Sequence, residues 1–222
     1  LNIKNQITFE NKWLTQNFLI LNGAVKQHFV YKLLLDNNIE PGFAKIQEII
    51  NFIEDNQNSK TGKTLSVSRE KVLFASHKYT YFIENGNAGK IDDVIVIDKE
   101  GSYVLGGAYK LTIEKNSGKI DKFPKNTGLT AYADLSGIGF PFVLRTRRNG
   151  DIIQPFGMQG RMKLKKYFIN KNIPEHERAS IVLLCRDNEV LWAAGAGLSE
   201  KLRAGDIPEY KLKLEIMENG NN

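Results

Sequence analysis

Cysteine is almost absent from this chain of 222 residues, because Cys185 is the only one. A single cysteine excludes an internal disulfide and a zinc cluster built on cysteines, and it fits a reducing compartment. Long apolar runs are also missing: the candidates, such as residues 94–97 and 181–185, have the length of strands and not the ~20 residues of a membrane-spanning helix. Residues 1–4 show neither part of a secretory signal. We therefore expect a cytoplasmic protein without a membrane span.

The motifs of self-contained active sites are missing too. His28, His77 and His176 are scattered without the spacing of a metal site, so no metal is expected. The chain contains no GxxxxGK[ST] phosphate loop, no SGGxDS nucleotide loop and no GxSxG nucleophile turn. Cys185 ends an apolar run with no histidine nearby in the sequence, which favours an inert buried thiol over a nucleophile. The sequence therefore predicts no catalytic residue in this chain.

The composition is that of a globular protein, with 41% hydrophobic and 25% charged residues. Apolar residues at three- and four-residue spacing predict a helical domain over residues 1–60. Short β-branched and aromatic runs between polar turns predict a β-rich region over 61–140, and a mixture of both patterns predicts an α+β domain over 141–218. The predicted fold class is α+β. The first residue is Leu1 and not Met, which suggests a part of a longer protein.

Individual elements follow from the same patterns. The helical domain is predicted to contain helices over residues 11–21, 25–36 and 41–55, with their apolar stripes in the core. The double glycine Gly106-Gly107 is interpreted as a β-bulge, since a lone pair of glycines is weak evidence for a phosphate loop. Strands are predicted over 64–67, 72–75, 79–83, 94–97, 103–113, 129–135, 142–146, 181–185 and 190–194, and a further helix over 161–170.

Positive charge is concentrated in one segment. The chain has 31 Lys and Arg against 25 Asp and Glu, a formal net charge of +6. Residues 145–171 hold eight of the positive residues and one acid, a net charge of +7, so the rest of the chain carries −1. Such a patch on a nearly neutral protein is typical of a polyanion site, although a solvated basic surface is an equal alternative at this stage.

Four features could organise this basic segment around a ligand. The arginines at 145, 147 and 148 straddle the end of a predicted strand, so that alternate side chains point to opposite faces. Asp151 either fixes a neighbouring arginine or caps the turn at Asn149-Gly150. Gly157 and Gly160 allow close approach of a ligand or a tight entry into the helix. The helix's first amides and nearby cations could together bind phosphate.

The basic segment also resembles a known family. It is similar to the C-terminal domain of tRNA(Ile)-lysidine synthetase over about 60 residues, 144–202. The helical start of the chain is similar to the middle domain of that family, much less specifically. The residues that carry the resemblance are RTRRNGDIIQPFGM at 145–158, Gly160, KLKKYF at 163–168, KNIPEHER at 171–178, IVLL at 181–184 and VLWAAG at 190–195.

The resemblance implies a ligase that uses ATP, with magnesium, to attach lysine to the wobble cytidine of an isoleucine tRNA. The family's ATP-pyrophosphatase domain, which carries the catalytic and ATP-binding residues, precedes the helical domain and is not found in this sequence. The chain thus looks like the C-terminal half of that enzyme, inactive alone and without a cofactor of its own. Its partners would be tRNA(Ile), with lysine and ATP as substrates of the full enzyme. Whether a homodimer forms is left open.

We therefore predict a tRNA-backbone surface, with a non-enzymatic basic module that binds RNA or an acidic protein as the alternative function. A structural scaffold with incidental basicity is a third. The residues expected to support the surface are Asp151, Gly157, Gly160 and Arg178. The residues expected to bind tRNA are Arg145, Arg147, Arg148, Arg161, Lys163, Lys165 and Lys166.

Overall fold

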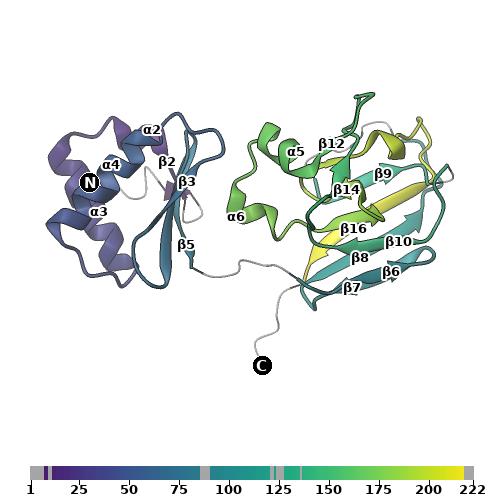
Figure 1. Ribbon diagram of the computed structural model, residues 1–222, viewed down its shortest axis with the longest axis horizontal. Coiled ribbons are helices and arrows are strands. Elements are labelled where there is room, and N and C mark those ends of the chain that lie inside the picture. Colours follow the sequence, from purple (N-terminus) through teal and green to yellow (C-terminus); the bar gives the residue numbers. More distant parts are fainter. Residues whose placement is uncertain are drawn as a thin grey trace. The chain divides into compact units, whose positions relative to one another are not determined.

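The computed structural model describes residues 8–9, 12–85, 91–120, 123, 128–135 and 137–217. The chain divides into two compact units, unit 1 over 1–88 and unit 2 over 89–222 (Figure 1). Both units combine helices with sheets, which confirms the α+β class. The boundaries predicted after residues 60 and 140 do not coincide with this division, because strand pairing joins segments on both sides of each.

Unit 1 begins with strands where the sequence predicted a helix over residues 11–21. Strand β2 (Lys12–Leu14) precedes the short helix α2 (Thr15–Leu19), and β2 pairs with β1 (Thr8–Phe9). Trp13 of β2 lies opposite Thr80 in the sheet and is buried. Pairing with a segment 67 residues away therefore overrides the helical spacing of the apolar residues.

Two longer helices follow as expected. Helix α3 (Gly23–Asp36) begins where the Asn22 side chain accepts a hydrogen bond from the Val25 amide at 2.9 Å, an N-cap. Helix α4 (Phe43–Asp55) buries Ile49, Ile50 and Ile53, although Phe43 at its first turn is exposed. These stripes pack on the antiparallel sheet β1-β2-β5-β4-β3, whose remaining strands are β3 (Lys63–Ser66), β4 (Lys71–Ala75) and β5 (Tyr79–Glu84).

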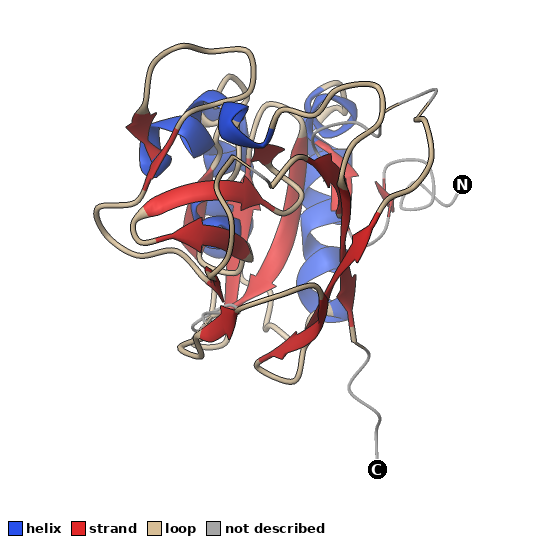
Figure 2. Cartoon of the chain, turned by 90° about the vertical axis from the view of Figure 1, so that its right-hand side faces the viewer, coloured by secondary structure: helices blue, strands red, loops and turns tan. Residues whose placement is uncertain are grey.

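Unit 2 is built mainly from strands and loops, with few helices (Figure 2). Its smaller sheet has the order β7-β8-β16-β9 and its larger sheet the order β12-β11-β14-β13-β10-β6, with β15 beside β14. The helices are α5 (Leu164–Asn170), α6 (Glu175–Arg178) and the 3₁₀ helix η1 (Glu200–Leu202). The strands are β6 (Ile95–Ile97), β7 (Gly101–Leu105), β8 (Tyr109–Lys115), β9 (Thr130–Ala133), β10 (Phe142–Arg145), β11 (Ile152–Ile153), β12 (Met162–Lys163), β13 (Leu183–Arg186), β14 (Glu189–Ala193), β15 (Gly197–Leu198) and β16 (Tyr210–Ile216).

The Gly106-Gly107 pair is not a bulge. Both glycines have positive φ, 57° and 66°, and they lie in the turn that joins β7 to β8. A hairpin turn needs this left-handed backbone, which glycine adopts without steric cost. The predicted strand over 103–113 is therefore two strands of one hairpin.

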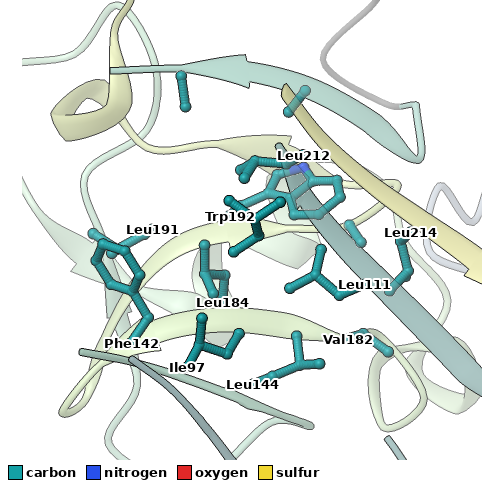
Figure 3. Close-up of a cluster of buried hydrophobic side chains, with 14 of the residues drawn as sticks. Ile97, Leu111, Phe142, Leu144, Val182, Leu184, Leu191, Trp192, Leu212 and Leu214 are labelled. Carbon is teal, nitrogen blue, oxygen red and sulfur yellow. The ribbon is translucent and has the colours of Figure 1, made fainter. Parts of the chain in front are cut away.

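The larger sheet of unit 2 is covered on both faces. Leu184 of β13 points into a core shared with the smaller sheet, together with Trp192, Leu111 and Leu212 (Figure 3). The flanking residues Leu183 and Cys185 belong to a second core, on which α5 packs. A strand buried on both faces has no reason to alternate apolar with polar residues, which explains the continuous apolar run at 181–185.

Candidate nucleic-acid interface

The basic segment lies entirely in unit 2. It runs from the end of β10 through β11 and β12 into α5, and β11 pairs with both β12 and β14. Figure 1 shows α5 beside β12, and β11 lies between β12 and β14 in the sheet. The segment is therefore built on the edge of the larger sheet and on the helix that covers one of its faces.

Arg145 does not reach the surface. Its side chain is 3% exposed, and its Nη1 and Nη2 donate to the two carboxylate oxygens of Asp151 at 3.0 and 2.8 Å. The same nitrogens donate to the carbonyl oxygens of Thr146 and Asp187, both at 3.0 Å. Burial alone would lower the pKa of Arg145, but the hydrogen bond that it donates to Asp151 and the negative charge of that carboxylate outweigh burial and raise the pKa. The prediction that Arg145 belongs to the tRNA surface is wrong, because its guanidinium is used inside the fold.

Asp151 has both of the roles that the sequence left open. Besides pairing with Arg145, its Oδ2 accepts a hydrogen bond from the Arg148 amide at 2.8 Å, which caps the turn. Its backbone carbonyl accepts from the amide of Leu164 at 2.8 Å. The first amide of α5 is therefore occupied by the protein itself and is not free for phosphate.

Arg147 and Arg148 differ in exposure. Arg148 is exposed, whereas Arg147 is half-buried and its Nε has no hydrogen-bond partner among the described residues. Both line a small pocket of about 90 Å³ together with residues 91–94. This pocket includes two aspartates as well as the arginines, so it has mixed charge.

Arg178 is an internal support of the chain. It is 5% exposed, and its Nε and Nη2 donate to the carbonyl oxygen of Ile173 at 2.9 and 2.7 Å. Burial lowers the pKa of Arg178, with a further lowering by the charge of Arg147 and an opposing effect of Glu175. Arg178 thus fixes the segment between α5 and α6 rather than facing a ligand.

The lysines of β12 and α5 do face solvent. Helix α5 buries Leu164, Tyr167 and Phe168, and the prediction that Leu164 and Phe168 face the core is confirmed. Lys163, Lys165 and Lys166 are exposed, and none of their three ammonium groups forms a hydrogen bond or ion pair with a residue that the structure describes. Their charge is therefore available to a ligand.

Arg161 is exposed but paired. Its Nε lies 3.4 Å from Oε1 of Glu189, whose other oxygen accepts from Nζ of Lys201 at 2.5 Å. Lys201 belongs to η1, some 40 residues further along the chain. The tertiary structure thus brings Lys201 and the following Arg203 to the basic segment, although they lie outside the window that the sequence singled out.

Gly157 and Gly160 have different roles in the loop between β11 and β12. Gly157 has a φ of 81° and occupies the third position of a turn closed by a hydrogen bond from the Met158 amide to the Pro155 carbonyl at 3.0 Å. A positive φ at this position defines a type II turn, which favours glycine. Gly160 does not have a positive φ, and a side chain there would meet open space.

The described residues provide no reactive thiol, no metal-binding cluster and no membrane-spanning helix. Cys185 is a free, buried thiol, and burial raises its pKa to about 12, so it is protonated and unreactive. No group of three or more His, Cys, Asp and Glu residues in the described part of the chain could hold a metal ion. None of the helices in that part combines the length and apolar character needed to cross a membrane.

The comparisons with known proteins agree with the resemblance seen in the sequence. Residues 142–212 match the family model described as the TilS substrate C-terminal domain. The tRNA(Ile)-lysidine synthase of Dehalococcoides mccartyi is 30% identical over 124 residues, which are 53% of this chain and 26% of that protein. The tRNA(Ile)-lysidine synthase of Caldanaerobacter subterraneus subsp. tengcongensis is 25% identical over 205 residues, 90% of this chain and 42% of that protein. The chain thus spans less than half the length of these relatives.

One solved structure is also similar. The crystal structure of a TILS C-terminal domain covers 57% of this chain and 100% of its own, at 23% identity and a TM-score of 0.45. The family model and the curated relatives confirm the predicted resemblance to the C-terminal half of tRNA(Ile)-lysidine synthetase.

Proposed function

We propose that the chain is the tRNA-binding part of a tRNA(Ile)-lysidine synthase, because residues 142–212 match the family model described as the TilS substrate C-terminal domain. The proposed surface consists of exposed or half-exposed cations, with Asp151 and Arg178 supporting it from within the fold and the exposed Gly157 and Gly160 in its loop. Its residues are Arg147, Arg148, Arg161, Lys163, Lys165 and Lys166.

The observation that carries this proposal is the set of three free lysines, Lys163, Lys165 and Lys166. Lysines without acidic partners in the described part of the chain leave a local positive potential, which attracts the phosphates of a nucleic acid. Such contacts position an RNA backbone and carry no sequence information by themselves. The isoleucine tRNA would therefore be selected elsewhere in the full enzyme or by its shape.

The full enzyme would be a cytoplasmic ligase that uses ATP, with magnesium, to attach lysine to the wobble cytidine of tRNA(Ile). We assign ATP, lysine and the reacting atoms to the ATP-pyrophosphatase domain that the family resemblance implies, and no residue of this chain to them. The chain by itself is expected to support no ATP-dependent incorporation of lysine into tRNA. Adding the ATP-pyrophosphatase domain of the same protein should restore incorporation.

Binding of folded tRNA tests the proposal directly. Fluorescence anisotropy with labelled tRNA(Ile) should show saturable binding that weakens steeply as salt rises. Unlabelled tRNA(Ile) should displace the probe at lower concentration than heparin or duplex DNA of equal charge. Equal displacement by all three polyanions would favour the rival function, a basic module that binds polyanions or acidic proteins in general. Absence of tRNA binding would leave only a structural role.

A further inference from the structure

An aromatic side chain stands at the corner of the turn between β11 and β12. Phe156 occupies the second position of the type II turn Pro155–Met158, and it is 39% exposed although phenylalanine is usually buried. Neither the charge pattern nor the residues that carry the family resemblance assign it a role beyond being part of the loop.

The turn is held rigidly by the segment that leads into η1. The Phe156 amide donates to the Leu198 carbonyl at 3.1 Å, and the Glu200 amide donates to the Gln154 carbonyl at 2.9 Å. Pro155 and Ser199 form an isolated antiparallel bridge between these two hydrogen bonds. Hydrogen bonds from the segment 198–200 therefore hold the backbone at residues 154 and 156, on either side of Pro155.

Side chains complete this support. The Glu200 carboxylate accepts from the Gly157 amide at 2.6 Å and from Nε and Nη2 of Arg203 at 2.5 and 3.0 Å. The guanidinium carbon of Arg203 lies 4.3 Å from the centre of the Phe156 ring, a cation–π contact. One carboxylate thus fixes both the turn and the cation that rests on the ring.

Arg203 is the cation in contact with the ring, and Arg161 and Lys163 follow the turn in the chain. Glu189 pairs with Arg161 and with Lys201, and Glu200 pairs with Arg203, whereas the Lys163 side chain has no such partner within the described residues. A rigid, exposed aromatic ring among cations is the arrangement with which proteins bind unpaired nucleotides: the cations contact the phosphates and the ring stacks on a base. The ring cannot be used in this way by a base pair inside a duplex, whose faces are already stacked.

We propose that Phe156, backed by Arg203, is a stacking site for an unpaired nucleobase of the bound RNA. The proposal rests on the proposed function, because it assumes that this surface binds RNA. It adds a contact that depends on the aromatic face and not on charge, and it directs that contact to a single-stranded part of the RNA. Glu200 and Gly157 are positioning residues for this site.

The test compares two RNA probes and four proteins. The probes are a blunt-ended RNA hairpin whose loop is replaced by a non-nucleotide linker, so that it has no unpaired base, and the same hairpin with an unpaired adenosine tail. The proteins are the unmodified chain, Phe156→Ala, Phe156→Leu and Phe156→Trp. Phe156→Leu keeps apolar bulk on the turn but removes the aromatic face, and circular dichroism verifies that each variant is folded. Anisotropy titrations at several salt concentrations give the dissociation constant and its salt dependence.

We expect Phe156→Ala and Phe156→Leu to weaken binding of the tailed hairpin by about 5- to 100-fold, the range of one lost base–aromatic stack. Binding of the blunt hairpin should stay the same, Phe156→Trp should retain the preference for the tail, and the salt dependence should not change because no charge is removed. With 2-aminopurine in the tail, the fluorescence change on binding should be lost in Phe156→Leu.

Three results would overturn the inference, and only the last of them also overturns the proposed function. If the unmodified chain binds tRNA(Ile) and both hairpins but Phe156→Leu behaves like it, RNA binding stands and the stacking site is wrong. Equal weakening for the blunt and the tailed hairpin would also remove the stacking site. If the unmodified chain binds neither tRNA(Ile) nor the hairpins, the proposed function and the inference fail together.

Discussion

Two parts of the basic segment, residues 145–151 and 161–166, look alike in the sequence and differ in the fold. In the first, Arg145 is 3% exposed and bound by Asp151 on both terminal nitrogens. In the second, the three lysines are exposed and have no partner within the described part of the chain. Arg145 and Asp151 of the first part stabilise unit 2, and we propose that Arg147, Arg148 and the second part bind RNA.

The difference follows from what a charge needs when it leaves water. A buried guanidinium must replace its hydration with hydrogen bonds, and Asp151, Thr146 and Asp187 supply them to Arg145. An exposed lysine keeps its water and its freedom, so it needs no partner and its charge acts on whatever approaches. Charge density along the sequence therefore overstates the ligand-facing charge, because it counts both kinds.

The largest expected effect is on stability and comes from the buried pair. Asp151→Ala leaves the Arg145 charge buried without its counter-charge, which should lower the free energy of unfolding of unit 2 by about 3–5 kcal/mol. Urea unfolding followed by the fluorescence of Trp192 measures it. The two tryptophans lie in different units, so a Trp13→Phe background confines the signal to unit 2.

Two controls separate the lost pair from the loss of a residue. The double variant Arg145→Met with Asp151→Leu removes both charges and should recover most of the stability, because apolar replacements of buried ion pairs are often neutral. Lys165→Ala, at an exposed position, should change stability by less than about 0.5 kcal/mol. A loss below about 1 kcal/mol in Asp151→Ala would mean that Arg145 does not depend on this partner.

The second prediction concerns binding without a change in stability. Replacing Lys163, Lys165 and Lys166 together by alanine should weaken tRNA(Ile) binding and flatten its salt dependence. The slope of log K against log salt should fall by about 0.7–0.9 for each phosphate contact that is lost. Anisotropy titrations over a range of salt concentrations measure it, and the urea midpoint of unit 2 should be unchanged.

A matched triple variant tests whether location or total charge matters. Lys99, Lys115 and Lys119 are exposed in the same unit but outside the basic segment, and Lys115 lies 3.9 Å from the Glu100 carboxylate. Replacing the three by alanine also lowers the formal net charge from +6 to +3. If both triple variants lose the same affinity, binding depends on the overall charge and the proposed surface is wrong. If replacing Lys163, Lys165 and Lys166 leaves both the affinity and the slope unchanged, these lysines do not belong to the interface.

The smallest expected effect is on the free energy of unfolding of unit 2, when either glycine of the loop between residues 151 and 161 is replaced by alanine. Gly157→Ala must place a side chain at a φ of 81°, which should destabilise unit 2 by about 1–2 kcal/mol, although open space surrounds the position. Gly160→Ala meets no such restraint and should be neutral or stabilising by up to about 1 kcal/mol, since alanine restricts the unfolded chain. Urea unfolding of both variants decides, and equal effects would contradict the type II turn.

Much of the fold could be predicted from local patterns. Helices α3 and α4 follow from apolar stripes with end signals, and the hairpin strands of unit 1 follow from short β-branched runs. Strand β2 could not be predicted, because its pairing partner β5 lies far away in the sequence and decides its conformation. Strand β16 was not predicted either, although its alternation of buried Leu212 and Leu214 with exposed Lys213 is a strand pattern.

The sequence by itself determined the α+β class, the family resemblance and the position of the positive charge along the chain, since each of these depends only on the order of residues. The tertiary structure decided which of these charges face a ligand. It paired Arg145 with Asp151, turned the lysines of α5 outward, and brought Lys201 and Arg203 to the turn that carries Phe156. Burial and proximity across distant segments depend on packing, and packing is not readable from spacing along one chain.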